Sequence, residues 1–149
     1  GTWAARSSYR GALVRKTVNQ TITTGITTAI TFDAELYDTD SIHDNVTNNT
    51  RLTVPAGITK VRFSGNGSFA ENTTGFRSFN VFKNGVEFQG RFGINVSPTS
   101  GSLSIMNATT SALDVIGGDY FEIMVAQNSG GNLAFKSSET TWFAMEIIE

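Results

Sequence analysis

Hydrophobic and polar residues alternate with a period of two along most of the chain, which is the spacing of a strand with one buried face. In residues 120–127, for example, the apolar positions are Phe121, Ile123 and Val125. Similar alternation predicts strands at residues 12–18, 28–36, 51–54, 61–69, 76–83, 102–107, 112–116, 120–127 and 141–148. No segment has apolar residues at the spacing of a helix of three turns, so the pattern predicts an all-β protein.

Residues that favour turns separate the expected strands. Asn84-Gly85 lies between two alternating runs, and this dipeptide indicates a hairpin because both turn positions need a positive φ. Gly65 and Gly67 fall on the apolar side of the strand at 61–69, which indicates a bulge or a close backbone approach. About ten short strands in 149 residues, with no linker between them, are typical of a two-sheet antiparallel jelly-roll sandwich.

The composition supports a folded domain and excludes several kinds of site. With 39% hydrophobic residues and a net charge of −2, the chain can form a core. It has no cysteine, which excludes disulfides, thiolate zinc sites and cysteine nucleophiles, and its single histidine, His43, excludes a multi-histidine metal site. The apolar runs are too short to span a bilayer as a helix, so we expect no membrane insertion. A sequence pI of about 5.4 argues against nucleic-acid binding.

Two of the expected strands, 120–127 and 141–148, carry apolar residues on both faces. The residues predicted to form the core are Phe32, Val61, Phe63, Phe121, Ile123, Val125, Phe143 and Ile147. A strand in a sandwich needs only one buried face, so a second apolar face indicates contact with another copy of the chain. The residues predicted for this subunit interface are Tyr120, Met124, Trp142 and Ile148.

The order of several short motifs resembles a known family. The motifs are Thr31-Phe32-Asp33, Tyr37-Asp38, Arg51-Leu52-Thr53-Val54-Pro55-Ala56-Gly57, Val61-Arg62-Phe63, Lys83-Asn84-Gly85, Gly118-Asp119-Tyr120-Phe121-Glu122-Ile123 and Thr141-Trp142-Phe143-Ala144-Met145. Over roughly residues 10–149, this order resembles the globular head of the q subunit of the first complement component, a tumour-necrosis-factor-like jelly roll. The phrases Tyr37-Asp38-Thr39-Asp40, Ile42-His43-Asp44 and Gln127-Asn128-Ser129-Gly130-Gly131 are similar to versions found in bacteriophage structural proteins. The resemblance implies a homotrimer and implies no enzyme.

The resemblance also implies a role on the surface of a phage virion assembled in the host cytoplasm. The expected protein is a head fibre, a capsid decoration protein or the tip of a tail fibre, acting in assembly and host-surface attachment. Its expected partners are further copies of itself, capsid or fibre-shaft proteins, and a glycan of the host surface. The alternatives are a carbohydrate-recognition module of a cell-surface protein and a polysaccharide hydrolase, which would need a suitable pair of carboxylates.

Loops at the ends of a jelly roll often carry recognition, and three segments are long and polar enough for this role. They are residues 37–50, 71–75 and 89–100, which we expect to form one distal surface. The candidate ligand contacts are Tyr37, Asp40, His43, Arg91 and Phe92, since sugars need planar polar groups and an aromatic face. No glycine-framed serine nucleophile accompanies His43, so a surface or inter-subunit contact is a better interpretation than a general base.

The same loop contains Asp38, Asp40 and Asp44, whose alternating oxygen ligands make them candidates for binding calcium. The loop has no EF-hand pattern, and aspartates also occur in turns because their side chains bind nearby backbone groups. We therefore predict turn hydrogen bonds for these residues, and no metal or other cofactor.

Residues 1–11 lack strand alternation and contain basic residues without any acidic one. We predict that this segment is an arm that precedes a jelly-roll domain at residues 12–149. Trp3 and Tyr9 supply large apolar surfaces and Arg6 and Arg10 supply charge, so we expect docking on a neighbouring subunit or on an acidic partner. The alternative is a linker without a partner.

Overall fold

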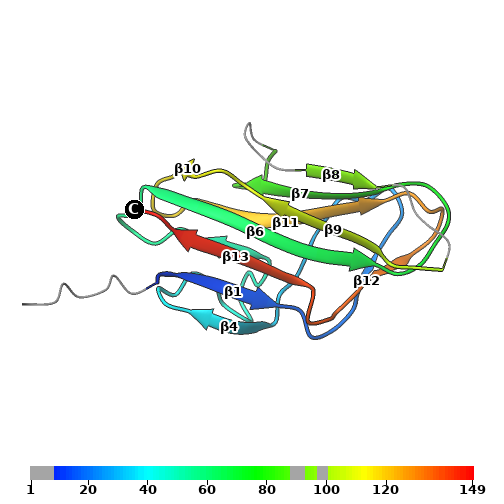
Figure 1. Ribbon diagram of the computed structural model, residues 1–149, viewed down its shortest axis with the longest axis horizontal. Helices are drawn as coiled ribbons and strands as arrows, with labels where there is room; N and C mark the ends of the chain where they lie inside the picture. The colour runs from blue at the N-terminus through cyan, green and yellow to red at the C-terminus, as the bar shows by residue number, and fades with distance from the viewer. Residues whose placement is uncertain (1–8, 88–92, 97–100) are drawn as a thin grey trace, which may run out of the picture.

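The computed structural model describes residues 9–87, 93–96 and 101–149 of the chain, which form strands joined by turns and loops (Figure 1). The strands are β1 (Gly11–Arg15), β2 (Gln20–Ile22), β3 (Thr28–Ala29), β4 (Ala34–Asp38), β5 (Arg51–Thr53), β6 (Lys60–Phe69), β7 (Arg77–Lys83), β8 (Gly93–Val96), β9 (Ser104–Thr109), β10 (Leu113–Asp114), β11 (Tyr120–Gln127), β12 (Leu133–Phe135) and β13 (Trp142–Ile147). Within these described ranges, no helix has the length and apolar character needed to cross a membrane.

The strands form two antiparallel sheets. The eight-stranded sheet has the order β2-β12-β6-β13-β1-β4, with β9 and β10 paired to the other edge of β6. The five-stranded sheet has the order β3-β11-β7-β8, and β5 also pairs with β11. This is the predicted two-sheet jelly-roll sandwich. The described residues hold thirteen strands rather than about ten, because several strands have only two or three residues.

The expected strand at 12–18 stops at Arg15, and a second strand, β2, begins at Gln20. Lys16 explains the break, because its side chain turns inward and its Nζ atom donates to the carbonyl and the hydroxyl of Thr31 at 2.9 and 2.8 Å. The expected strand at 28–36 is likewise divided into β3 and β4. The strand at 120–127, in contrast, matches β11 residue for residue.

The sandwich has two ends, which we call the terminal end and the far end. The terminal end holds the first residue of β1 and the last residues of the chain, because Gly11 is paired with Glu146 (Figure 1). Loop 39–50 lies at the same end, since Asp38 is paired with Ala12. Segments 70–76 and 128–132 lie at the far end, beyond the last residues of β6 and β11.

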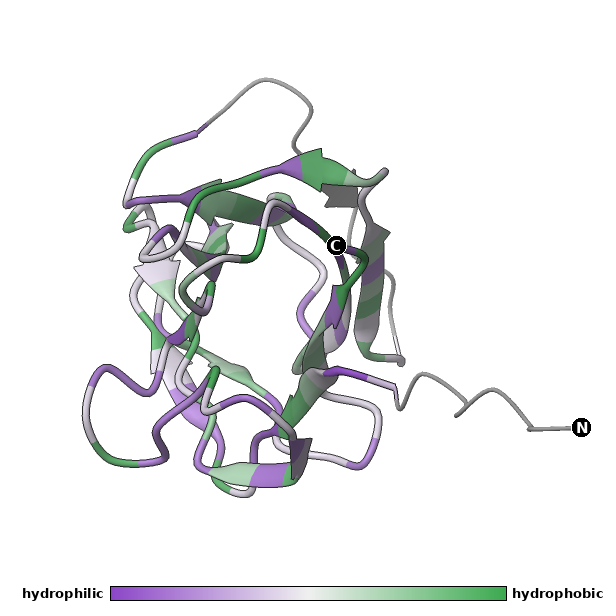
Figure 2. Cartoon of the chain, turned by 90° about the vertical axis from the view of Figure 1, so that its left-hand side faces the viewer, coloured by the Kyte–Doolittle hydropathy of each residue, from purple (hydrophilic) through white to green (hydrophobic). Residues whose placement is uncertain are grey.

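The core lies between the two sheets, and Figure 2 shows them end-on around it. Of the eight residues predicted to form the core, seven are at most 1% exposed, and Ile147 is partly buried against them. The Phe63 ring lies 4.2 Å from that of Phe121 and 5.6 Å from that of Phe143, measured between centroids. This packing confirms the predicted inward positions.

The hairpin turn at Asn84-Gly85 is also confirmed. Both residues have positive φ angles, 51° and 80°, as the predicted turn type requires. The Asn84 side chain joins this turn to the next loop, because its Nδ2 group donates to Asp119 and its Oδ1 atom accepts the Tyr120 N–H, both at 2.9 Å.

Candidate functional site

Loop 39–50 begins immediately after β4, and Asp38 fixes its first turn. The Asp38 carboxylate accepts backbone N–H groups from Asp40, Ile42 and His43 at 3.2, 2.9 and 2.9 Å. Further along, the Asp44 carboxylate accepts two more backbone N–H groups, which lower the pKa of Asp44. These bonds are the predicted turn interactions of short acidic side chains.

Asp40 forms an ion pair with Arg10, whose side chain bonds both carboxylate oxygens. The Arg10 bond, together with a 2.6 Å hydrogen bond from the Thr39 hydroxyl, lowers the pKa of Asp40. Arg10 was expected to bind a partner surface, and Asp40 was expected to bind a ligand. The structure shows these two residues bound to each other within one chain, and their binding to a partner or ligand stays a prediction.

The three aspartates suggested for calcium do not form a site. In the described part of the chain, no group of three or more acidic, histidine or cysteine side chains lies close enough to hold a metal ion. The Asp38 and Asp44 carboxylates face backbone N–H groups, and the Asp40 carboxylate faces a guanidinium. Their oxygens therefore point at three different places rather than at one cation.

His43 is held inside the loop and is not a surface contact. Its side chain has no exposed surface, and Nε2 lies 3.1 Å from the carbonyl oxygen of Asn49. A carbonyl only accepts hydrogen bonds, so Nε2 carries a proton and donates it. The other nitrogen, Nδ1, lies 3.2 Å from Glu35. Both nitrogens are occupied, which removes His43 from the predicted ligand contacts.

Tyr37 lies on the other side of β4, on the outer face of the eight-stranded sheet. Its hydroxyl donates to the Tyr9 hydroxyl at 3.1 Å, and the two rings meet edge to face with centroids 5.6 Å apart. Burial and this hydrogen bond raise the pKa of Tyr9. Tyr9 was expected to dock on a neighbouring subunit or partner protein, but its observed contact is Tyr37 of its own chain.

Four of the predicted contacts fall on residues that the structure does not describe. Arg91 and Phe92, with Trp3 and Arg6 of the arm, lie outside the described residues. Loop 39–50 and segment 71–75 were expected to share one distal surface, but they lie at opposite ends of the sandwich. Since β4 and β6 end at opposite ends of the same sheet, the loops that follow them cannot meet.

The structure instead places a shallow hollow of about 280 Å³ between loop 39–50 and β5. Residues 41–44 and 47–48 line it together with Arg51 and Thr53. The Arg51 guanidinium stacks on the Tyr120 ring, with its carbon 3.9 Å from the ring centroid. The stacking orients a cation at the edge of the hollow. Only the cross-strand pairing of β5 with β11 brings these two residues together, so the sequence pattern gave no signal for them.

The four predicted interface residues lie on two different sheets. Trp142 belongs to β13, and Ile148 follows the last residue of that strand at the terminal end of the eight-stranded sheet. Tyr120 and Met124 point outward from β11 in the five-stranded sheet. A ring-shaped trimer uses two different patches of each subunit, so contact of these four residues with neighbouring copies stays a prediction.

The outer face of the eight-stranded sheet carries several apolar side chains. At its centre Leu13 lies between Ala144 and Tyr37 in neighbouring strands. The exposed apolar residues on or beside this face are Tyr9, Leu103, Ile105 and Ile148, which are 40 to 61% exposed. On the five-stranded sheet, Tyr120 is already covered by Arg51, and polar Glu122 separates it from Met124.

The chain matches solved structures across almost its whole length. Murine APRIL at pH 5.0 aligns over 95% of this chain and 100% of its own, with 10% sequence identity and a TM-score of 0.70. Eiger TNF from S. frugiperda aligns over 95% of this chain and 93% of its own, with 10% identity and a TM-score of 0.62. The sequence matches no protein-family model and no curated protein. At this identity the comparison shows the fold, which is the TNF-like jelly roll.

Proposed function

We propose that this chain is a non-enzymatic binding module that works as a homotrimer. The observation that carries the proposal is the apolar outer face of the eight-stranded sheet, on a jelly roll with the TNF-like fold. Leu13 and Ala144 form the centre of this face, and Ile148 lies at its terminal end. Further copies of the same chain would remove Leu13 and Ile148 from water, which favours association.

The chemistry of the described residues supports a binding role over catalysis. The chain has one histidine and no cysteine. The buried ring of His43 has both nitrogens engaged, by Asn49 and Glu35, so it does not offer a free general base. The carboxylates of loop 39–50 are likewise engaged, Asp44 by backbone N–H groups and Asp40 by Arg10.

We propose further that the trimer sits on the surface of a bacteriophage virion, as a head fibre, a capsid decoration protein or a tail-fibre tip. The support is the resemblance of residues 37–44 and 127–131 to phage structural proteins. In this role the terminal end faces the virion, because β1, the first strand after the arm, begins there. The far end and the sides of the sandwich then face the host surface.

The test is the mass of the protein in solution. We expect light scattering at micromolar concentration to give three times the chain mass of 16.0 kDa. Leu13→Glu should dissociate the trimer, because it places a charge at the centre of the apolar face. Met124→Glu is the matched control on the other sheet, and it should leave the trimer intact.

A monomeric wild-type protein would contradict the proposal. A trimer that dissociates with Met124→Glu but not with Leu13→Glu would place the interface on the five-stranded sheet instead. Virion location is tested separately by immunogold labelling of intact particles with an antibody raised against the purified chain. Absence of label from the particles would refute the virion role.

A further inference from the structure

A groove of about 280 Å³ opens where two neighbouring chain segments leave the eight-stranded sheet together. Phe135 is paired with Phe69, and Trp142 is paired with Asn66. The chain between Phe135 and Trp142 therefore has six residues, 136–141, opposite only two residues of β6. Beside it, residues 16–19 leave the sheet between β1 and β2. The groove lies between these two segments.

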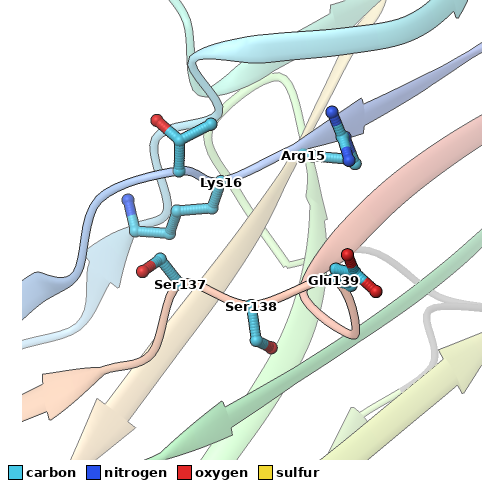
Figure 3. A pocket seen from close by; sticks show the side chains of 6 residues that line it. Arg15, Lys16, Ser137, Ser138 and Glu139 are labelled. Carbon is cyan, nitrogen blue, oxygen red and sulfur yellow. The ribbon is translucent and has the colours of Figure 1, made fainter.

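Figure 3 shows Arg15 and Lys16 on one side of the groove and Ser137, Ser138 and Glu139 on the other. Lys16 stabilises the wall of the groove and has no donor left for a ligand. Its ammonium donates to Gln20 and twice to Thr31, at 2.8 to 3.1 Å, so its three N–H donors are in use.

Two hydroxyl groups on opposite walls present only acceptor lone pairs to the groove. The Thr17 hydroxyl donates its proton to Asp33 at 2.5 Å, because a carboxylate can only accept. The Ser137 hydroxyl donates to the Oδ1 atom of Asn19 at 3.0 Å. Each oxygen keeps lone pairs that can accept a further hydrogen bond.

Arg15 and Glu139 are the charged residues that line the groove. Neither has a partner within the part of the chain that the structure describes. The Arg15 Nε atom is buried and makes no hydrogen bond. Glu139 is exposed, and the two charges do not form an ion pair with each other. The groove therefore offers a cation that only donates hydrogen bonds and three groups that accept them, in Thr17, Ser137 and Glu139.

A ligand that satisfies this set must both accept and donate hydrogen bonds over a short distance, as the hydroxyl groups of a sugar do. The formal charges around the groove cancel, since Arg15 and Lys16 face Asp33 and Glu139, so a phosphate or a carboxylate gains no net attraction. Trp142 is the strand partner of Arg15 on the same outer face and adds an aromatic ring beside the groove.

We infer that this groove binds a neutral saccharide unit, with Arg15 donating to its hydroxyl oxygens and Glu139 accepting from its hydroxyl groups. The inference deepens the proposed function by giving the binding module a ligand class. It also moves the site away from the loops at the terminal end. The groove lies beyond the Arg15–Trp142 pair, farther from the terminal end than Leu13 and Ala144.

The test is a printed array of neutral, sulfated and sialylated oligosaccharides, probed with the full chain. We expect binding to neutral oligosaccharides. Arg15→Met should weaken this binding about tenfold or more, since it removes a charged hydrogen-bond donor but keeps the aliphatic stem. Glu139→Gln should weaken it several-fold. Arg62→Met is the matched control, because Arg62 lies on the same sheet face but is paired with Glu146.

Three results would overturn the inference: no binding to the array, binding of sulfated or sialylated glycans only, or neutral-glycan binding that survives both Arg15→Met and Glu139→Gln. Light scattering and thermal unfolding of each variant confirm that it stays folded and show its oligomeric state. A trimer that binds no neutral glycan refutes the groove but not the trimer. A monomer that binds glycan through Arg15 refutes the trimer but not the groove.

Discussion

Phe135 occupies the space that a side chain at position 67 would need, because a β-carbon built on Gly67 would overlap the Phe135 ring. Phe135 also packs edge to face against Phe69, which lies in the same strand as Gly67, with ring centroids 5.2 Å apart. Gly67 does not have a positive φ, so packing and not backbone conformation requires glycine here. A bulge or a close backbone approach was predicted for this glycine, but the group that comes close is the side chain of Phe135.

We therefore expect Gly67→Ala to lower the free energy of unfolding by about 1–3 kcal/mol, because the added methyl group overpacks the core. Urea denaturation monitored by tryptophan fluorescence measures the change. Gly131→Ala is the control, since nothing lies within 4 Å of a β-carbon at that position and its φ is not positive. Equal stability of the two variants would contradict the packing explanation.

Arg77 anchors the loop at the far end of the sandwich. The residue is fully buried, and its guanidinium donates to the backbone carbonyls of Asn72, Thr74 and Phe76 at 2.9 to 3.0 Å. We expect Arg77→Met to cost about 1–3 kcal/mol of stability, because buried hydrogen-bond acceptors lose their donor. Amide hydrogen exchange should then accelerate in residues 70–76.

The control for this prediction is Lys136→Met, which removes a half-buried cation without removing donors from segment 70–76. Its exchange rates in residues 70–76 should match those of the wild-type protein. Slow exchange in that segment after Arg77→Met would show that other contacts hold the loop.

Local patterns predicted the fold well because alternation decides which side chains face inward. Phe121, Ile123 and Val125 are buried as the period of two requires, and Asn84-Gly85 turns as its φ preference requires. Alternation does not say which sheet a strand joins. Tyr120 and Trp142 therefore looked equivalent in the sequence, although they belong to different sheets.

The prediction that residues of the loop after β4 share one binding surface was wrong for a related reason. The pairing of β1 with β4 shifts between Leu13 and Val14, which leaves Leu36 as an extra residue. Tyr37 consequently faces outward with Leu13, whereas Glu35 faces His43. Such a shift depends on the partner strand, so residues 35–43 alone could not reveal which side chains share a surface.

Asp119 should make the stability of the protein depend on pH in the acid range. Burial would raise the pKa of Asp119, but hydrogen bonds from Asn84, the Ile116 N–H and Lys83 outweigh burial and lower the pKa. An unfolded aspartate titrates near pH 3.9. The stabilisation is therefore present above about pH 3.9 and is lost as the pH falls towards the lower pKa of the folded state.

Urea denaturation between pH 7 and about pH 2 measures this dependence. We expect Asp119→Asn to be less stable than the wild type at pH 7 and to lose less stability on acidification. Asp114→Asn is the control, because the Asp114 side chain is 92% exposed. Parallel pH profiles for the wild type and Asp119→Asn would contradict this role for Asp119.

The N-terminal arm gives a prediction that separates folding from attachment. Tyr9 and Arg10 are already bound to Tyr37 and Asp40 of the same chain. Deleting residues 1–8 keeps these contacts, so we expect the thermal midpoint and the oligomeric mass to stay unchanged. The deletion removes Trp3 and Arg6, which we propose as the docking residues of the arm. Occupancy on purified virions, measured by quantitative mass spectrometry, should therefore fall.

The matched control is the full chain with Trp3→Ala and Arg6→Ala, which keeps the length of the arm and should lower occupancy as the deletion does. If only the deletion lowers occupancy, the length of the arm matters and these two side chains do not anchor it. If both proteins reach wild-type occupancy, the arm is a linker. The attachment to the virion must then come from the folded domain, for which the exposed end surface formed by loop 39–50 is the next candidate.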